Sequence, residues 1–533
     1  MTIEMNNPPR TWEEIVEKKR LEAFNKIPEA WRLPAHYTDR VNEDACWNVL
    51  NVPRECCILT DRELQITEEY DAVALVEAIS GACFTAEEVA VAFCKRAAIA
   101  QQLTRCLTET FFDEAIEHAR GLDQFFREHG KVKGPLHGLP ISMKDSFCVK
   151  GHEATVGFVS FIGKSTATTN SPLVDILLES GAVLYVKTNI PQTMMTADSE
   201  NNIFGRVLNP HKLCLGAGGS SGGEGALVAM RGSILGVGTD IAGSVRIPAL
   251  CCGVFGFKPT AGRIPYGGQS SGNRKGNPGI QPCAGPLATS FRDMAFFMDA
   301  VLSARPWDSD PTALAVPWKT ATAKKSVLNI GVVGEDTTTY PFHSAVARTL
   351  SSAVEVLKQA GHRLIPLDTA PPIVAEAAAL SFKLFALDNS RTPRQHIDAS
   401  GEPPVRSLTD SLPDYSVRRF SLEDLFDFNA QRAEIAARWH RVWLENDLDA
   451  IIMPGHRKTA SQHDTYGHPV YTVVWNLVDW PACSVPYGKV DASVDLDSDF
   501  VDGAPCSVQV VGRRFQDEEL LAVAGVIASS LHG

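Results

Sequence analysis

Short apolar runs and longer amphipathic segments alternate along much of the chain. The apolar runs have the length of strands and lie at residues 182–186, 328–333, 363–367, 449–453 and 507–511. Segments with helical periodicity alternate with them, at residues 290–303, 344–360, 424–446 and 516–530. The run at residues 182–186 is apolar throughout, which is typical of a strand that is buried on both faces. The pattern therefore predicts an α/β protein in which helices cover both faces of a large, mixed and mostly parallel β-sheet.

The first part of the chain differs from the rest. A helical segment of mixed charge is followed there by a stretch that several prolines interrupt. We expect residues 1–70 to form a helical N-terminal extension and residues 71–533 to form one large domain. Within that domain, residues 385–425 are polar, contain prolines and lack periodicity, which predicts a surface insertion.

Composition and charge exclude several classes of function. Of the 533 residues, 44% are hydrophobic and 21% charged, and the net charge is −13. This charge argues against nucleic acid or an anionic membrane as the main partner. No apolar run reaches the roughly 18 residues of a membrane span, and no apolar core of a signal peptide follows Met1. We therefore expect a cytoplasmic protein without a membrane or nucleic-acid partner.

Cysteine and histidine are not arranged as metal ligands. The 13 cysteines include no Cys-x-x-Cys pair, and no His-Glu-x-x-His motif is present. Most of the cysteines, such as Cys94, Cys251 and Cys252, have apolar neighbours and are expected to be buried thiols. The sequence predicts no metal and no cofactor.

Glycine and serine are concentrated between residues 216 and 250. Gly216-Ala-Gly-Gly-Ser-Ser-Gly-Gly-Glu224 forms one turn, and Gly238-Thr-Asp-Ile-Ala-Gly-Ser-Val-Arg-Ile-Pro-Ala249 forms a second. Such turns let the backbone come close to a ligand. The segment between them suits a short buried helix and then a strand, which would open both turns into one cleft. Two tight structural loops are the plain alternative.

These two turns closely resemble the signature of the amidase signature family. The upstream element of that family is also present, as Gly138-Leu-Pro-Ile-Ser-Met-Lys-Asp145, and Lys187–Gln192 and Gly256–Thr260 match further motifs. The resemblance extends from about residue 70 to the C-terminus and is strongest to the fungal acetamidase branch. It implies the amidase signature fold and an amide hydrolase. Ala242 departs from the pattern, since the family usually has glycine there.

The resemblance implies three catalytic residues. Ser244 would be the nucleophile, Lys144 the base, and Ser220, after a cis peptide bond, the relay between them. A serine at the start of a helix is more often only an N-cap, and a lysine on a strand usually extends to solvent. A lysine accepts a proton only when it is neutral, which the apolar neighbours of Lys144 favour.

Other residues of the two turns would bind or support. The backbone N–H groups of Ile241, Ala242, Gly243 and Ser244 would form the oxyanion hole. Met194 would line the cleft. Ser221, Asp240 and Arg246 would support the turns by hydrogen bonds. Trp475 and Trp480 would either wall the acyl pocket or fill the core, and the second reading is favoured.

Two other catalytic motifs fail on spacing or context. Gly219-Ser-Ser-Gly-Gly223 satisfies Gly-x-Ser-x-Gly, but no suitable strand precedes it and no late histidine has a partner acid. Gly163-Lys-Ser165 lacks the correctly placed glycine of a phosphate loop. A catalytically silent interaction protein remains the alternative of another class.

We expect a small-molecule amide as substrate, most simply a small aliphatic primary amide that yields an acid and ammonia. An amidase for larger acyl or aryl amides, of the fatty-acid-amide or aryl-acylamidase type, is the alternative. A homodimer is possible on the sequence alone.

Overall fold

One large sheet organises the chain. The computed structural model describes residues 11–277, 279–323, 325–411, 419–496 and 498–533. Within them an 11-stranded sheet has the order β1-β3-β2-β6-β8-β7-β12-β13-β11-β9-β10, and β4 and β5 form a separate pair. The strands are β1 (Leu107–Thr110), β2 (Pro140–Lys144), β3 (Val183–Thr188), β4 (Glu200–Asn201), β5 (Gly205–Arg206), β6 (Leu235–Asp240), β7 (Phe255–Lys258), β8 (Cys283–Ala288), β9 (Asn329–Val332), β10 (Arg363–Pro366), β11 (Ala450–Met453), β12 (Ala482–Lys489) and β13 (Pro505–Val511).

The sheet is mixed, as predicted. Its parallel pairings lie in two blocks: β2 pairs with β3 and β6, and β9 pairs with β10 and β11. The strands between the blocks pair antiparallel, from β6 through β8, β7, β12 and β13 to β11. No described α-helix intervenes between β7 and β8 or between β12 and β13, so neighbouring strands there reverse direction.

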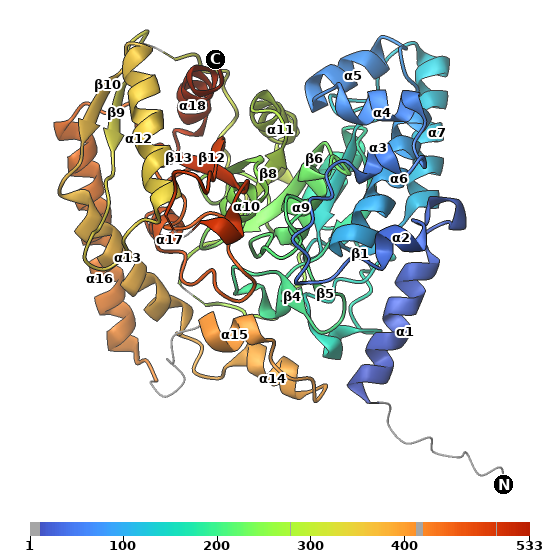
Figure 1. Cartoon of the computed structure of the whole chain (residues 1–533), viewed down its shortest axis with the longest axis horizontal. Coiled ribbons are helices and arrows are strands. Elements are labelled where there is room, and N and C mark those ends of the chain that lie inside the picture. The colour runs from blue at the N-terminus through green and yellow to red at the C-terminus, as the bar shows by residue number, and fades with distance from the viewer. Residues whose placement is uncertain (1–10, 278, 324, 412–418, 497) are drawn as a thin grey trace.

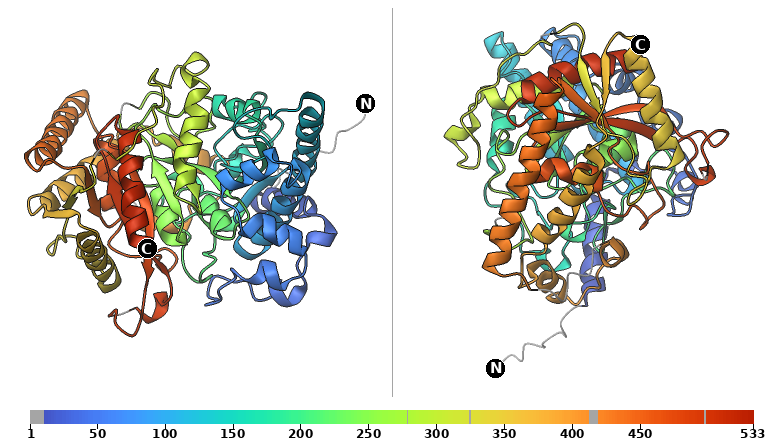
Figure 2. Two further views of the ribbon diagram at one scale, coloured as in Figure 1. Left: turned by 90° about the horizontal axis from the view of Figure 1, so that it is seen from above. Right: turned by 90° about the vertical axis from the view of Figure 1, so that its left-hand side faces the viewer.

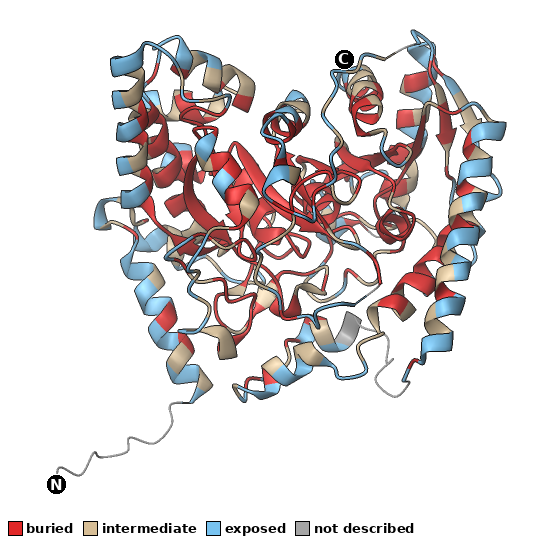
Figure 3. Cartoon of the chain, turned by 180° about the vertical axis from the view of Figure 1, so that it is seen from behind, coloured by how far each residue is buried: buried red, intermediate tan, exposed pale blue. Residues whose placement is uncertain are grey.

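Helices lie on both sides of this sheet (Figures 1 and 2), and its central strands are buried between them (Figure 3), whereas the edge strand β10 is exposed or half-buried. The α-helices are α1 (Trp12–Asn25), α2 (Ala35–Thr38), α3 (Val52–Glu55), α4 (Asp61–Glu68), α5 (Ala72–Ser80), α6 (Ala86–Thr104), α7 (Phe112–His129), α8 (Pro172–Glu179), α9 (Gly222–Ala229), α10 (Arg246–Cys252), α11 (Arg292–Ser303), α12 (Ser344–Gln359), α13 (Ala370–Phe385), α14 (Thr392–Asp398), α15 (Arg406–Ser411), α16 (Leu422–Glu445), α17 (Val470–Leu477) and α18 (Asp517–His532). None of the described helices is long and apolar enough to cross a bilayer.

The predicted elements agree with the structure where the sequence pattern is strong. The four amphipathic segments correspond to α11, α12, α16 and α18, and the five apolar runs to β3, β9, β10, β11 and β13. The pattern missed α17, whose eight residues are all buried, because such a helix has no polar face. The predicted insertion at residues 385–425 contains α14 and α15, while its residues 412–418 lie outside the described residues.

The N-terminal segment packs into the same core as the sheet. Its described part carries α1 to α4, and Ile27, Val49 and Ile66 are buried in the main hydrophobic cluster together with Ile141 of β2. The domain boundary near residue 70 stays a prediction.

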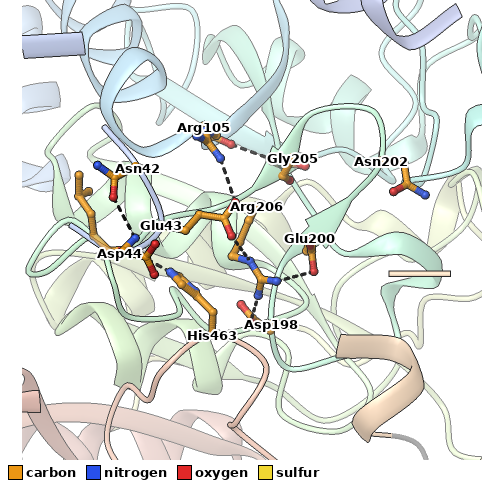
Figure 4. Close-up of polar contacts among 12 residues, drawn as sticks. Asn42, Glu43, Asp44, Arg105, Asp198, Glu200, Asn202, Gly205, Arg206 and His463 are labelled. Atoms are coloured by element: carbon orange, nitrogen blue, oxygen red, sulfur yellow. Dashed lines mark hydrogen bonds and ion pairs between the residues drawn. The ribbon is translucent and has the colours of Figure 1, made fainter. Parts of the chain in front are cut away.

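A buried arginine joins this N-terminal segment to distant parts of the chain (Figure 4). The guanidinium of Arg206 lies 2.5 Å from Asp198, 2.7 Å from Glu200, 3.0 Å from Asp464 and 3.2 Å from Glu43. Only 4% of the arginine side chain is exposed. The guanidinium of Arg206 therefore contacts four carboxylates, from the N-terminal segment, from β4 and the residues before it, and from the loop after β11, and Arg105 also pairs with Glu43.

Replacing Arg206 should destabilise the fold strongly. Arg206→Met would leave buried carboxylates without a counter-charge, which costs about 3–5 kcal/mol in comparable sites. The free energy of unfolding in denaturant measures this effect. The matched control is Lys18→Met, which breaks a pair whose side chains are 62% and 56% exposed and should change stability by less than about 1 kcal/mol. Equal stability of the two variants would contradict the role of Arg206.

Candidate active site

Lys144 lies at the end of β2 and is fully buried. Its Nζ donates to Ser220 Oγ at 2.7 Å and to Thr239 Oγ1 at 2.8 Å. Burial lowers the pKa of Lys144 to about 7, although the negative charges of Asp240, Glu224 and Asp145 oppose this shift. A substantial fraction of the amine is therefore neutral near pH 7, with its nitrogen directed at a serine hydroxyl.

The first glycine- and serine-rich turn presents Ser220 to this lysine. The Gly219–Ser220 peptide bond is cis, and only 2% of Ser220 is exposed. Gly219 lies so close to the backbone of Thr196 that an added Cβ would stand 2.5 Å from the carbonyl oxygen of that residue. Only glycine fits at that contact. The turn ends at Ser221, after which α9 begins.

Ser221 ties the first turn to the second. Its backbone N–H donates to the carbonyl oxygen of Ser244 at 3.2 Å. Its hydroxyl also bridges the backbone of Thr239, with both separations at 3.3 Å. Ser220 and Ser244 therefore belong to adjacent backbone segments, as the sequence led us to expect from two turns opening into one cleft.

Ser244 stands in the second turn, between the end of β6 and the start of α10. It is 7% exposed and borders a cavity. Around it, the N–H of Gly243 donates to Asp240 Oδ1 at 2.8 Å. Within the described residues the N–H groups of Ile241, Ala242 and Ser244 have no acceptor. These three amides are the donors that remain available to a ligand at Ser244.

The second turn is held by a buried ion pair. Asp240 also accepts from the N–H of Val245 at 3.1 Å, and Arg246 lies 3.0 Å from its Oδ1. Burial alone would raise the pKa of Asp240, but the guanidinium of Arg246 holds it well below its usual range. Asn476 and Gln509 accept further hydrogen bonds from Arg246. Both charged groups are thus occupied in supporting the turn and are not directed at the cavity.

Backbone geometry explains why alanine is tolerated at position 242, where the family usually has glycine. Gly243 has a φ of +124°, and an added Cβ there would stand 2.3 Å from Thr472 Oγ1. Ala242 has no positive φ, so an L-residue fits. The departure from the family pattern therefore leaves the turn intact.

Glu224 is a polar residue of the site that the sequence analysis did not single out. It lies in the first turn of α9, is fully buried, and accepts from Ser142 Oγ at 2.5 Å and Thr188 Oγ1 at 2.8 Å. Burial raises its pKa to about 7. Its position in the Gly-Ser-Ser turn was visible in the sequence, but its orientation toward β2 and β3 depends on the sheet.

The cavity beside Ser244 has a volume of about 950 Å³. Ile241, Ala242 and Ile247, which are close to Ser244 in sequence, line it together with Met194 and side chains of α13, α14 and α15. Trp475 and Trp480 do not line this cavity. They stack at 5.8 Å between ring centroids, and Trp475 packs on Trp439, so the reading that they fill the core is correct.

Across the described parts of the chain, no group of three or more His, Cys, Asp or Glu residues is placed to hold a metal ion.

Comparison with known proteins agrees with this geometry. Residues 88–521 match the protein family described as Amidase. An Amidase of Gibberella moniliformis is 43% identical over 98% of this chain and 99% of its own, and an Acetamidase of Emericella nidulans is 36% identical over the same shares. A solved structure of a fatty acid amide hydrolase, 32% identical, superposes with a TM-score of 0.91 and covers 98% of this chain and 95% of its own. The chain is an amide-hydrolysing enzyme and belongs to the amidase signature family.

Proposed function

We propose that the chain hydrolyses amides through an acyl-enzyme on Ser244, with Lys144 as the base and Ser220 as the proton relay. The observation that carries this proposal is the contact between a fully buried lysine and a serine hydroxyl at 2.7 Å. A buried amine with a lowered pKa is suited to general base catalysis near neutral pH.

The proposed reaction needs no group beyond these residues and water. Neutral Lys144 takes the proton of Ser220 as Ser220 takes that of Ser244, and Ser244 Oγ attacks the carbonyl carbon of the amide. The N–H groups of Ile241, Ala242 and Ser244 are the available donors for the oxyanion, while that of Gly243 is engaged by Asp240. The proton returns through Ser220 to the leaving nitrogen as the C–N bond breaks, and water then hydrolyses the ester.

A reagent that reacts with activated serines should label Ser244. We expect incubation with a fluorophosphonate, followed by peptide mapping, to place the adduct on Ser244. Lys144→Ala should slow labelling by at least about 10²-fold, because the base is lost. Lys95→Ala is the control for removing a partly buried lysine, because Lys95 lies on α6 and pairs with Glu63, and it should label at the wild-type rate. An adduct elsewhere in an active enzyme, or unchanged labelling of Lys144→Ala, would refute the assignment.

The volume of the cavity bears on the size of the substrate. About 950 Å³ lies at the upper end of the range for small-molecule sites and far exceeds what acetamide would fill. The similarity to a fatty acid amide hydrolase also supports a substrate larger than acetamide. The similarity to fungal acetamidases supports small amides instead. We infer that the enzyme acts on larger acyl or aryl amides, which was the alternative to the small aliphatic primary amides expected from the sequence.

A panel of primary amides of increasing length separates these two readings. Each methylene buried in the cavity contributes about 0.8 kcal/mol, which is a several-fold gain per carbon if the gain is expressed in the transition state. We expect kcat/KM for ammonia release to rise from acetamide through butyramide to hexanamide, and to stay high for benzamide. A maximum at acetamide or butyramide, with a fall at hexanamide, would favour small amides as substrates and leave the mechanism on Ser244 untouched.

Cellular location, oligomeric state and the absence of a nucleic-acid partner stay predictions from the sequence. The alternative of a catalytically silent protein is not favoured, because the chain belongs to an amidase family and retains Lys144, Ser220 and Ser244.

A further inference from the structure

Arginine predominates among the charged residues that border the cavity. They are Arg274, Asp388, Arg391, Arg394 and Arg419. Four of the five are cationic, although the whole chain carries a net charge of −13. The titratable side chain of His468 also lines the wall, and burial lowers its pKa, so it is uncharged at neutral pH. The cavity therefore has a charge opposite to that of the protein.

Two of these arginines are not neutralised. Arg274 lies 3.5 Å from Asp388, and Arg394 lies 2.8 Å from Asp398 on the same helix. By contrast, Arg391 and Arg419 form no ion pair within the described residues. The carboxylate of Asp388 is further occupied by the backbone N–H groups of Ser390 and Thr392, at 3.0 and 2.7 Å. At least two guanidinium groups thus remain available to an anion that enters the cavity.

The cationic groups and the nucleophile lie at different depths. All four arginines are exposed, whereas Ser244 is 7% exposed. Apolar side chains border the cavity as well, among them Phe382, Ile397 and Leu408. The arginines belong to segments outside the 11-stranded sheet, including α14, which lies with α15 away from that sheet in Figure 1. A ligand that reaches from Ser244 to these arginines therefore needs an apolar body and an anionic outer end.

We propose that the enzyme prefers primary amides whose acyl chain ends in a carboxylate, bound by Arg391 and Arg419. This inference rests on the proposed function, because it requires the amide to react at Ser244. Arginine binds carboxylates through parallel hydrogen bonds, and a cation-lined cleft concentrates anions from solution. Since ammonia is a small leaving group, the acyl part must fill the cavity, and its far end meets the arginines.

Pairs of substrates that differ only in terminal charge test this proposal. Each pair consists of the monoamide of an α,ω-dicarboxylic acid, from six to ten carbons, and the ω-hydroxy amide of the same length. We expect the carboxylate to be preferred in kcat/KM by about tenfold or more at the best length. The preference should fall as sodium chloride is added, because salt screens exposed charges.

Variants test whether Arg391 and Arg419 cause the preference for a terminal carboxylate. Arg391→Gln combined with Arg419→Gln should reduce it to about twofold or less, with kcat/KM for the hydroxy amide within about twofold of wild type. The hydroxy amide thus reports that the variant is folded. Arg120→Gln, an exposed arginine on α7 that does not line the cavity, is the matched control and should keep the full preference.

The outcomes separate this inference from the proposed function. If wild type hydrolyses the hydroxy amide and the fluorophosphonate labels Ser244, yet no length shows a carboxylate preference, the inference is wrong and the proposed function stands. A preference that survives in the double variant also overturns the assignment to Arg391 and Arg419. If neither amide is hydrolysed and Ser244 is not labelled, both fail together.

Discussion

The mechanism that we propose for this enzyme depends on the complete burial of one amine, that of Lys144. A charged ammonium without solvent is strongly disfavoured unless carboxylates lie close to it. Lys144 instead contacts two hydroxyl groups, and the surrounding protein excludes water from it. Its proton affinity is therefore set by the core of the protein, and any change that admits water to this region should restore a cationic, inactive lysine.

The sheet and its covering helices maintain this balance. The parallel strands β3, β2 and β6 place Lys144 beside Thr239, and the start of α9 brings Ser220 to the same point. Asp240 and Glu224 would stabilise the charged lysine if they acted on it alone. Arg246 compensates Asp240, and burial favours the neutral form of Glu224. The fold thus provides support for the turns while limiting the negative charge that Lys144 experiences.

The motif residues could be predicted because they are local in sequence. At Gly219 and Gly243 a side chain would collide with Thr196 and Thr472 of the same chain. Glycine is therefore required at both positions, and the two turns can be recognised in the sequence. Strongly patterned elements such as α12 and β11 were also predictable. The partners of Lys144 and Glu224 could not be predicted in full, because Thr239, Ser142 and Thr188 meet them only when separate strands pair.

The lining of the cavity was the least predictable part of the site. Arg391 and Arg419 lie in a stretch without periodicity, where the sequence indicated only a polar insertion. Arg391 and Arg419 line the same cavity as Ser244 only because the tertiary structure brings these segments together. For the same reason a sequence pattern did not decide between a small and a large acyl pocket.

The pH dependence of kcat/KM for an uncharged primary amide tests the central claim most directly, because the claim is that Lys144 acts in its neutral form. A pKa lowered to about 7 means that the amine is protonated and inactive below that pH and neutral above it. Activity should therefore rise as the pH increases, with a midpoint near 7, and should level off above about pH 8. A midpoint near the ordinary lysine pKa of about 10.4, or activity unchanged down to pH 5, would contradict the account.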